Sequence, residues 1–184
     1  MSKVLIVLIV LVVIALFVMS LYNRLIKLNV AVSEAFSQIE VQLKRRSDLI
    51  PNLVETVKGY AAHEQATFEK VVSARAKATT ATTVADVAAA DGMVTQALRG
   101  LLAVAEAYPD LKASSNFLAL QEELSTTENK VSFARQFYNE NVRALNTAVK
   151  TMPTSFFAGM AKVTSREFYE VEDPQSRQAP TVKF

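Results

Sequence analysis

The 184-residue chain contains no cysteine and no tryptophan, a single histidine, four glycines and five prolines. Without cysteine it has no disulfide framework, thiol nucleophile or thiolate metal site. The shortage of glycine and proline excludes an all-β fold of this length, which would need many tight turns. Since 51% of the residues are apolar, the composition favours an all-α fold.

The single histidine also limits the chemistry that the chain can perform. His63 precedes Glu64, but Thr67 stands where a zinc-binding H-E-x-x-H motif needs its second histidine. The sequence has no G-x-S-x-G or S-x-x-K motif and no glycine-rich phosphate loop. Its 20 basic and 18 acidic residues are too balanced to indicate nucleic acid. We therefore expect no catalytic residue, metal or cofactor, and a protein that is not an enzyme.

A long apolar run lies near the N-terminus. No residue from Val4 to Met19 is polar or charged, and the run extends to Tyr22. As a helix this segment is about 28 Å long, close to the hydrocarbon thickness of a bilayer. A cleaved signal peptide is the alternative, but its apolar region is usually about 7 to 15 residues and precedes a small-x-small cleavage site. The stretch FVMSLYNRL offers no such site, so residues 1–22 are expected to be a retained single-pass transmembrane anchor.

The remaining sequence shows helical spacing of apolar residues. One stripe runs from the anchor through Leu25, Val32, Ile39 and Arg46, so the anchor and the first helix are expected to be continuous. The stretch 47–51 predicts the end of that helix, because its Leu-Ile-Pro disfavours helical geometry before the proline.

Three further helices follow in the same pattern. The first of them is expected to run to about Lys77, with Asp48 as the cap at its start and Pro51 in its first turn. The other two are expected at about 84–108 and 117–152. A threonine-rich linker, ATTATTVAD (78–86), and a turn, YPDLKASSN (108–116), are expected between the helices. Short connections favour antiparallel neighbours, so residues 23–153 are predicted to form an up-and-down antiparallel four-helix bundle. An aromatic segment and a polar tail are expected over residues 154–184.

The cationic run Lys44-Arg45-Arg46 places Arg46 on the apolar stripe. In an up-and-down bundle Arg46 lies level with about residue 126 of the last helix, near three acids: Glu122, Glu123 and Glu128. We expect a buried or half-buried pair with one of them that fixes the helix register. A ligand or partner site is the alternative. Lipid headgroups are too distant, because Lys44 lies about 33 Å along the helix beyond the anchor.

Two long segments carry a family resemblance: YNRLIKLNVAVSEAFSQIEVQLKRRSDLIPNLVETVKGYAAHE, and ENKVSFARQFYNENVRALNTAV. With PTSFFA, EFYE and the terminal APTVKF, they resemble the LemA family over nearly the whole chain after the anchor. The resemblance implies an all-α bundle tethered to a bacterial membrane and gives no catalytic residues to carry over. The motifs contain the candidates for structural or interaction roles, which are Arg45, Arg46, Asp48, Pro51, Glu64, Glu128, Arg135, Tyr138 and Asn139.

The resemblance also bears on function and location. It implies a role in envelope maintenance or membrane remodelling, and we expect a non-enzymatic, membrane-anchored scaffold in the bacterial inner membrane. An adaptor of a membrane protease is the alternative, and sensing of a small molecule or peptide in the bundle core is a third hypothesis. The cations that flank the anchor slightly favour a cytoplasmic location for the helical domain. The lipoprotein-like relatives imply the opposite side. We give the resemblance more weight and expect an extracytoplasmic domain.

Self-assembly is expected because the second and third helices carry more alanines than one core stripe can use. The remaining small apolar faces would leave weakly polar surfaces of the kind that mark contacts. A common membrane plane favours a closed homo-oligomer of side-by-side copies.

Overall fold

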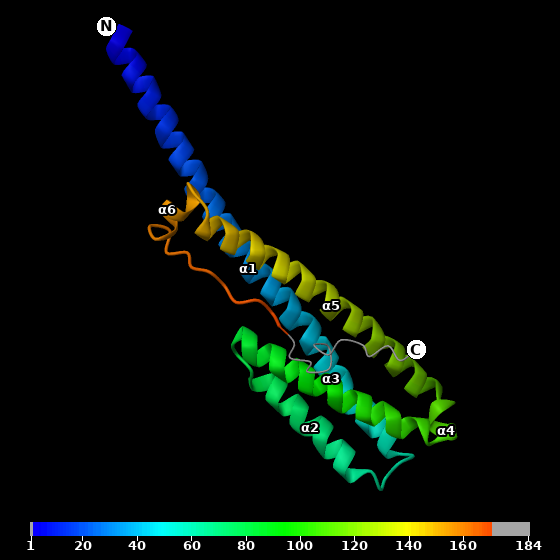
Figure 1. Ribbon diagram of the computed structural model, residues 1–184. Coiled ribbons are helices and arrows are strands. Elements are labelled where there is room, and N and C mark those ends of the chain that lie inside the picture. Colours follow the sequence, from blue (N-terminus) through cyan, green and yellow to red (C-terminus); the bar gives the residue numbers. More distant parts are fainter. Residues whose placement is uncertain (1, 171–184) are drawn as a thin grey trace, which may run out of the picture. The chain divides into compact units, whose positions relative to one another are not determined.

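A computed structural model describes residues 2–170 of the chain (Figure 1). These residues form six helices and no strand. The helices are α1 (Ser2–Lys58), α2 (Gln65–Thr80), α3 (Val84–Glu106), α4 (Pro109–Lys112), α5 (Ser115–Lys150) and α6 (Thr154–Ala158). The expected all-α class is confirmed for this part of the chain. The polar tail expected near the C-terminus falls mainly on residues 171–184, outside the described part.

The N-terminal part of α1 is long and apolar enough to cross a membrane. Its large side chains from Val4 to Met19 are mostly half exposed or more, all around the helix. Such a helix finds no protein core to bury it, which is typical of a lipid-facing segment. α3 also passes the test of length and apolar composition, but its side chains Val87, Val94 and Leu101 are buried in the protein.

The predicted end of the first helix at residues 47–51 is wrong. α1 continues through Pro51 to Lys58, and the chain turns only at Gly59–Glu64. Asp48 is therefore not an N-cap and lies inside α1. A proline inside a helix removes the hydrogen bond to the carbonyl four residues earlier, which is that of Ser47. The guanidinium of Arg75 supplies a replacement donor, as described below, and sequence spacing alone did not indicate it.

The two connections expected between later helices are shorter than predicted. The threonine-rich stretch 78–86 belongs mostly to helices, because α2 ends at Thr80 and α3 begins at Val84. Thr83 caps α3: its hydroxyl accepts a hydrogen bond from the backbone N–H of Asp86 at 3.1 Å. The predicted turn at 108–116 contains the short helix α4. α5 ends just before Pro153, as the sequence predicts.

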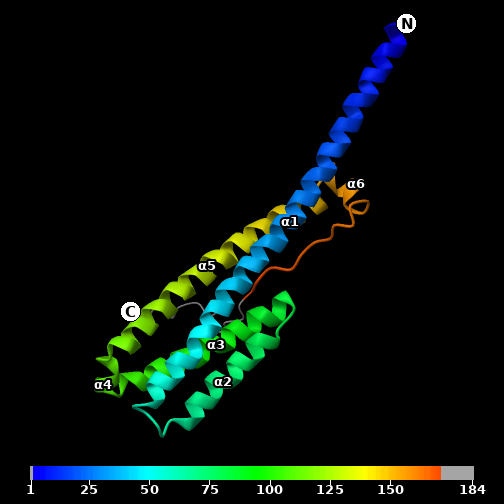
Figure 2. The ribbon, with the colours of Figure 1, turned by 180° about the vertical axis from the view of Figure 1, so that it is seen from behind.

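The described chain forms two compact units. Unit 1 comprises residues 2–38 and Ala134–Phe168, and unit 2 comprises Ile39–Phe133 with Tyr169 and Glu170. In unit 2, α2 and α3 lie side by side (Figure 2). Its apolar core draws buried side chains from all five helices of the unit, including Leu53 of α1, Phe68 of α2, Leu101 of α3, Leu111 of α4 and Phe117 of α5.

Unit 1 is formed where α1 and α5 run together with α6 and the extended segment after it. The rings of Phe36 and Tyr138 meet with centroids 5.7 Å apart. A second contact joins Leu25 of α1, Ala148 of α5 and Ala158 of α6 in one buried cluster. The stripe position predicted for Leu25 and Val32 is therefore a core position in this unit.

Candidate functional site

Arg46 lies in the interior of unit 2, where it meets two carboxylates. The residue is only 5% exposed. Its Nη1 donates hydrogen bonds to Asp91 Oδ1 at 2.9 Å and to Thr95 Oγ1 at 3.0 Å. Its Nη2 forms an ion pair with Glu128 Oε2 at 2.8 Å. Glu128 is one of the three acids expected opposite Arg46, whereas Asp91 of α3 was not expected as a partner.

The carboxylate of Asp91 is fully engaged inside the protein. Its Oδ1 accepts from Arg46 and its Oδ2 accepts from the hydroxyl of Tyr169 at 3.1 Å. Both Asp91 and Tyr169 are buried, at 3% exposure each. The attraction within a buried ion pair offsets the cost of desolvation best where further hydrogen bonds satisfy the charged groups. Both oxygens of Asp91 accept such bonds, whereas the buried Nε of Arg46 has no hydrogen-bond partner within the described part of the chain. The cluster joins α1 and α3 to the chain after α6 within unit 2.

A second polar contact stabilises the proline inside α1. Arg75 Nε of α2 donates a hydrogen bond to the backbone carbonyl of Ser47 at 3.1 Å. Ser47 lies four residues before Pro51, so its carbonyl is the one that the proline leaves without a helical N–H. Arg75 thus replaces the missing hydrogen bond from a neighbouring helix, and α1 continues where the sequence pattern predicted its end.

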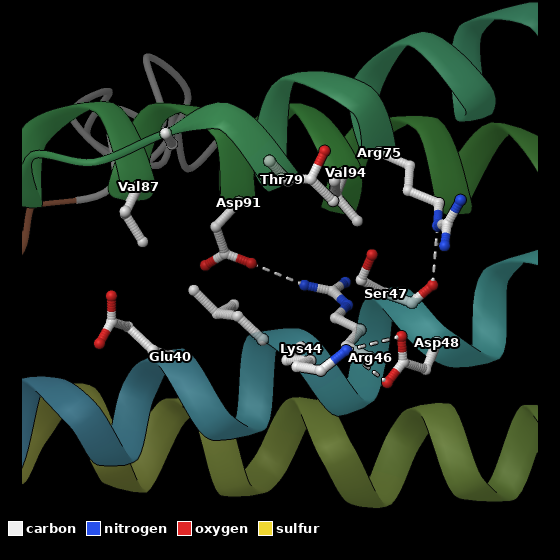
Figure 3. Close-up of a pocket in the computed structure, with 13 residues that line it drawn as sticks. Glu40, Lys44, Arg46, Ser47, Asp48, Arg75, Thr79, Val87, Asp91 and Val94 are labelled. Atoms are coloured by element: carbon white, nitrogen blue, oxygen red, sulfur yellow. Dashed lines mark hydrogen bonds and ion pairs between the residues drawn. The ribbon is translucent and has the colours of Figure 1, made fainter.

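A cavity of about 440 Å³ lies beside these two contacts (Figure 3). Six charged side chains line it: Glu40, Lys44, Arg46, Asp48, Arg75 and Asp91. Two of the cations pair with two of the acids, Arg46 with Asp91 and Lys44 with Asp48. Cations and acids are equal in number, so the lining does not favour a ligand of either charge.

The other sequence candidates in unit 2 lie nearer the surface. Arg45 donates from Nε to Glu123 Oε1 at 3.1 Å, and its Nη2 also contacts that oxygen. Lys44 and Asp48 form an exposed i,i+4 pair at 3.2 Å. Glu64 occupies the N-cap position of α2, but its side chain makes no capping hydrogen bond. Exposed pairs of this kind contribute about 0 to 1 kcal/mol to stability.

The candidates Arg135, Tyr138 and Asn139 lie on α5 in unit 1. Tyr138 is 2% exposed, and its hydroxyl donates to the backbone carbonyl of Glu167 at 2.9 Å. Burial raises the pKa of the Tyr138 phenol above its usual value; the charge of Arg166 opposes this shift and that of Glu167 adds to it. Arg135 and Asn139 are half buried and also make interactions within the protein. Tyr138 thus joins α5 to the extended segment after α6.

The raised pKa of Tyr138 predicts a loss of stability in alkali. In the unfolded chain tyrosine ionises near pH 10.0, while the buried phenol stays neutral to a higher pH. The stabilising contribution is therefore complete below pH 10 and is lost as the pH rises above it. We expect Tyr138→Phe to cost about 1 kcal/mol at pH 8, from the lost hydrogen bond, and to flatten the decline in melting temperature above pH 10.

The matched control is Tyr60→Phe, since Tyr60 is exposed. It should leave both the melting temperature at pH 8 and its alkaline decline unchanged. Identical alkaline melting curves for wild type and Tyr138→Phe would contradict the assignment.

Three residues of the polar clusters escaped sequence reasoning. Asp91 carried a usable signal, because it is a charged residue on the apolar stripe of its helix, as Arg46 is on α1. Two opposite charges on inward stripes are expected to pair. Arg75 and Tyr169 carried no such signal, since one is a cation on a polar helix face and the other lies in an extended segment.

Among residues 2–170, no three or more His, Cys, Asp or Glu side chains are grouped so as to hold a metal ion. The polar groups of unit 2 are instead arranged around Arg46. Arg46 lies in the motif KRRSDLIPNL, which is helical throughout and belongs to α1. This motif falls within the part of the chain that a family model matches. The model of the LemA family matches residues 35–184. The chain belongs to the LemA family.

A curated relative supports this membership. The chain is 27% identical over 139 residues to Protein LemA of Metamycoplasma hominis. The alignment covers 74% of this chain and 63% of that relative, so the chain spans less than two thirds of the relative's length. The family match begins at residue 35 and does not include the apolar N-terminal segment. The evidence for that segment is therefore the sequence and structure of this chain.

Proposed function

We propose that this LemA protein is a non-enzymatic, membrane-anchored scaffold that assembles with copies of itself in a bacterial inner membrane. The observation that carries the proposal is the continuity of α1. The helix begins with an apolar, exposed segment long enough to span a bilayer and continues without a break into the core of unit 1, where Leu25 and Val32 are buried. A bilayer-spanning segment of this kind would hold every copy in one plane. The family resemblance supports our proposal that the helical domain lies on the extracytoplasmic side.

The interior polar groups support a structural role. Arg46 and Asp91 are charged and buried, and although both line the cavity, they bind each other, Glu128 and Tyr169. We therefore assign these charges to fold specificity in an up-and-down four-helix bundle.

The surface of unit 2 supports self-assembly. The alanines of α2 and α3 differ in exposure. Ala74, Ala88, Ala90 and Ala105 are buried, Ala78 and Ala97 are half buried, and Ala66, Ala76, Ala85, Ala89 and Ala103 are exposed. Exposed large side chains accompany them, including Val72 and Met93. Small exposed residues beside apolar ones allow two helices to approach closely, so we propose contact between copies through α2 and α3.

Size measurement on the extracted protein tests this proposal. Membranes that contain the full chain are washed with carbonate, solubilised in mild detergent and examined by mass photometry. We expect the protein to remain in the washed membranes and to give a single defined multimer. Ala89→Glu should reduce the multimer to monomers without changing the helical circular dichroism signal, because Ala89 is exposed. Ser125→Glu, on the exposed face of α5, is the matched control and should leave the multimer intact.

Two other results would redirect the proposal. A monomer in several mild detergents and in nanodiscs would exclude self-assembly. A membrane protease recovered in stoichiometric amount with that monomer would favour the alternative, an adaptor in membrane-protein quality control.

A further inference from the structure

Three large apolar side chains are exposed at and around α6. Met152, Phe156 and Met160 are 76%, 74% and 68% exposed. Among the large apolar side chains of the N-terminal segment, the most exposed is that of Val4, at 66%. Single exposed apolar residues are ordinary, but a repeated set on one short segment indicates a contact surface.

Unit 1 holds this segment against the helix that leaves the apolar span. Leu25 and Ala158 share a buried cluster, and the half-buried Phe157 packs against it. Both views show α6 beside the part of α1 that follows the apolar segment (Figures 1 and 2). Leu25 lies only about 4.5 Å along α1 beyond Tyr22, where the apolar run ends. The exposed side chains therefore lie near the level of the membrane surface if the apolar run spans the bilayer.

The two phenylalanines of α6 have different roles. Phe157 faces the protein, and the ring of Phe156 meets it edge-on with centroids 5.4 Å apart and an angle of 82°. Phe156 itself faces outward. The inner ring thus supports the outer one in an exposed position, although exposure to water is unfavourable for an aromatic side chain.

Cations flank this apolar surface. Arg24 and Lys27 follow the apolar run on α1, Lys150 precedes Met152, and Lys162 follows Met160; all four are exposed. Apolar and aromatic side chains bordered by lysine and arginine are typical of segments that lie in the interface of a membrane with anionic lipids.

We propose that Met152, Phe156 and Met160 form a second membrane contact, inserted at the headgroup boundary of the bilayer that the N-terminal helix spans. The contact rests on the proposed membrane anchoring and adds to it. One helix alone leaves the domain free to rotate and tilt about its anchor. A second contact on α6 fixes the face that unit 1 turns toward the lipid, and the neighbouring cations favour anionic headgroups. Fixed orientation of each copy also favours lateral assembly.

Depth-dependent fluorescence quenching tests the contact in the full-length protein. Because the chain has no cysteine, single cysteines can be introduced and labelled with an environment-sensitive dye in nanodiscs of phosphatidylcholine and phosphatidylglycerol. Phe156→Cys should be quenched several-fold more strongly by nitroxide-labelled lipid than Phe137→Cys. Phe137 is the control because it is an exposed phenylalanine of the same unit, about 20 Å along α5 before Lys150.

A third label at Val10→Cys separates the two proposals. The α6 contact would be overturned, and the anchor supported, if quenching were strong at Val10→Cys but equally weak at Phe156→Cys and Phe137→Cys. Weak quenching at Val10→Cys would overturn the anchor and the contact together. A blue-shifted dye at Phe156→Cys without lipid quenching would show a protein partner instead and would also overturn the contact.

A second variant checks that the exposed side chains cause the insertion. Phe156→Ser with Met160→Ser removes exposed groups only and should retain the helical circular dichroism signal. In that background the quenching of a dye at Met152→Cys should fall several-fold. Unchanged quenching would show that these side chains do not hold the segment at the lipid.

Discussion

Replacing Arg46 with methionine is expected to lower the free energy of unfolding by about 3 to 5 kcal/mol. Methionine fills a similar volume on the apolar stripe, so the loss comes from electrostatics rather than from a cavity. Asp91 is buried and would lose its ion pair with Arg46, while its hydrogen bond from Tyr169 would remain. An uncompensated buried carboxylate is costly because it has lost both its counter-ion and water. Chemical denaturation of the detergent-solubilised protein, followed by circular dichroism, measures the change.

Arg45→Met is the matched control for this prediction. The substitution is the same and the position is adjacent, but the side chains of Arg45 and its partner Glu123 are 50% and 38% exposed, against 6% for Arg46. We expect a loss of at most about 1 kcal/mol, since solvent replaces an exposed partner. Equal losses at the two positions would contradict the assignment of Arg46 to the interior.

The double variant Arg46→Met with Asp91→Leu should recover much of the stability. It removes both buried charges, and the side chain of Glu128 is 40% exposed, so its carboxylate can turn toward water without Arg46. Replacement of a buried ion pair by apolar residues of similar volume is often neutral. Additive losses in the two single variants and the double variant would show that Arg46 and Asp91 do not depend on each other.

The second large effect is expected at the proline inside α1. Pro51→Ala restores a backbone N–H that can donate to the carbonyl of Ser47, and we expect it to raise the free energy of unfolding by about 1 to 3 kcal/mol. Arg75→Met in the wild-type background should instead cost about 1 to 3 kcal/mol, because it leaves that carbonyl without its donor. Methionine keeps most of the length of the arginine stem.

The two substitutions together give the decisive comparison. With alanine at position 51, the carbonyl of Ser47 has a helical donor, so Arg75→Met should cost much less than it does in the presence of Pro51. The four denaturation curves form a double-mutant cycle with a coupling of about 1 to 2 kcal/mol. No coupling would mean that Arg75 stabilises unit 2 through some other contact.

The all-helical class and the core stripes could be predicted from spacing alone. Leu25, Val32, Ile39 and Arg46 were placed on one stripe, and each is buried. A long helix leaves little freedom in which residues face inward, because side chains at spacings of three and four must share a face. The membrane-spanning length of the N-terminal segment could also be predicted, because it depends only on the number of consecutive apolar residues.

The path of the chain at Pro51 could not be predicted in the same way. Local rules place a helix end there, since proline removes a hydrogen bond and restricts the residue before it. The outcome depended on Arg75, which is 28 residues away from Ser47 in the sequence. A cation on the polar face of α2 gives no sign that it will meet a backbone carbonyl of α1. The error therefore came from a tertiary contact that overrides a local preference.

The sequence by itself determined that this protein is helical, that its first segment is apolar enough to span a membrane and that Arg46 faces inward. These properties depend on side-chain type and on neighbours three and four residues away. Tertiary structure decided which groups neutralise Arg46, how α1 continues through Pro51 and which phenylalanine of α6 is exposed. Each of these depends on residues distant in the sequence, Asp91, Arg75 and Leu25, brought together by packing of helices whose register no local pattern specifies.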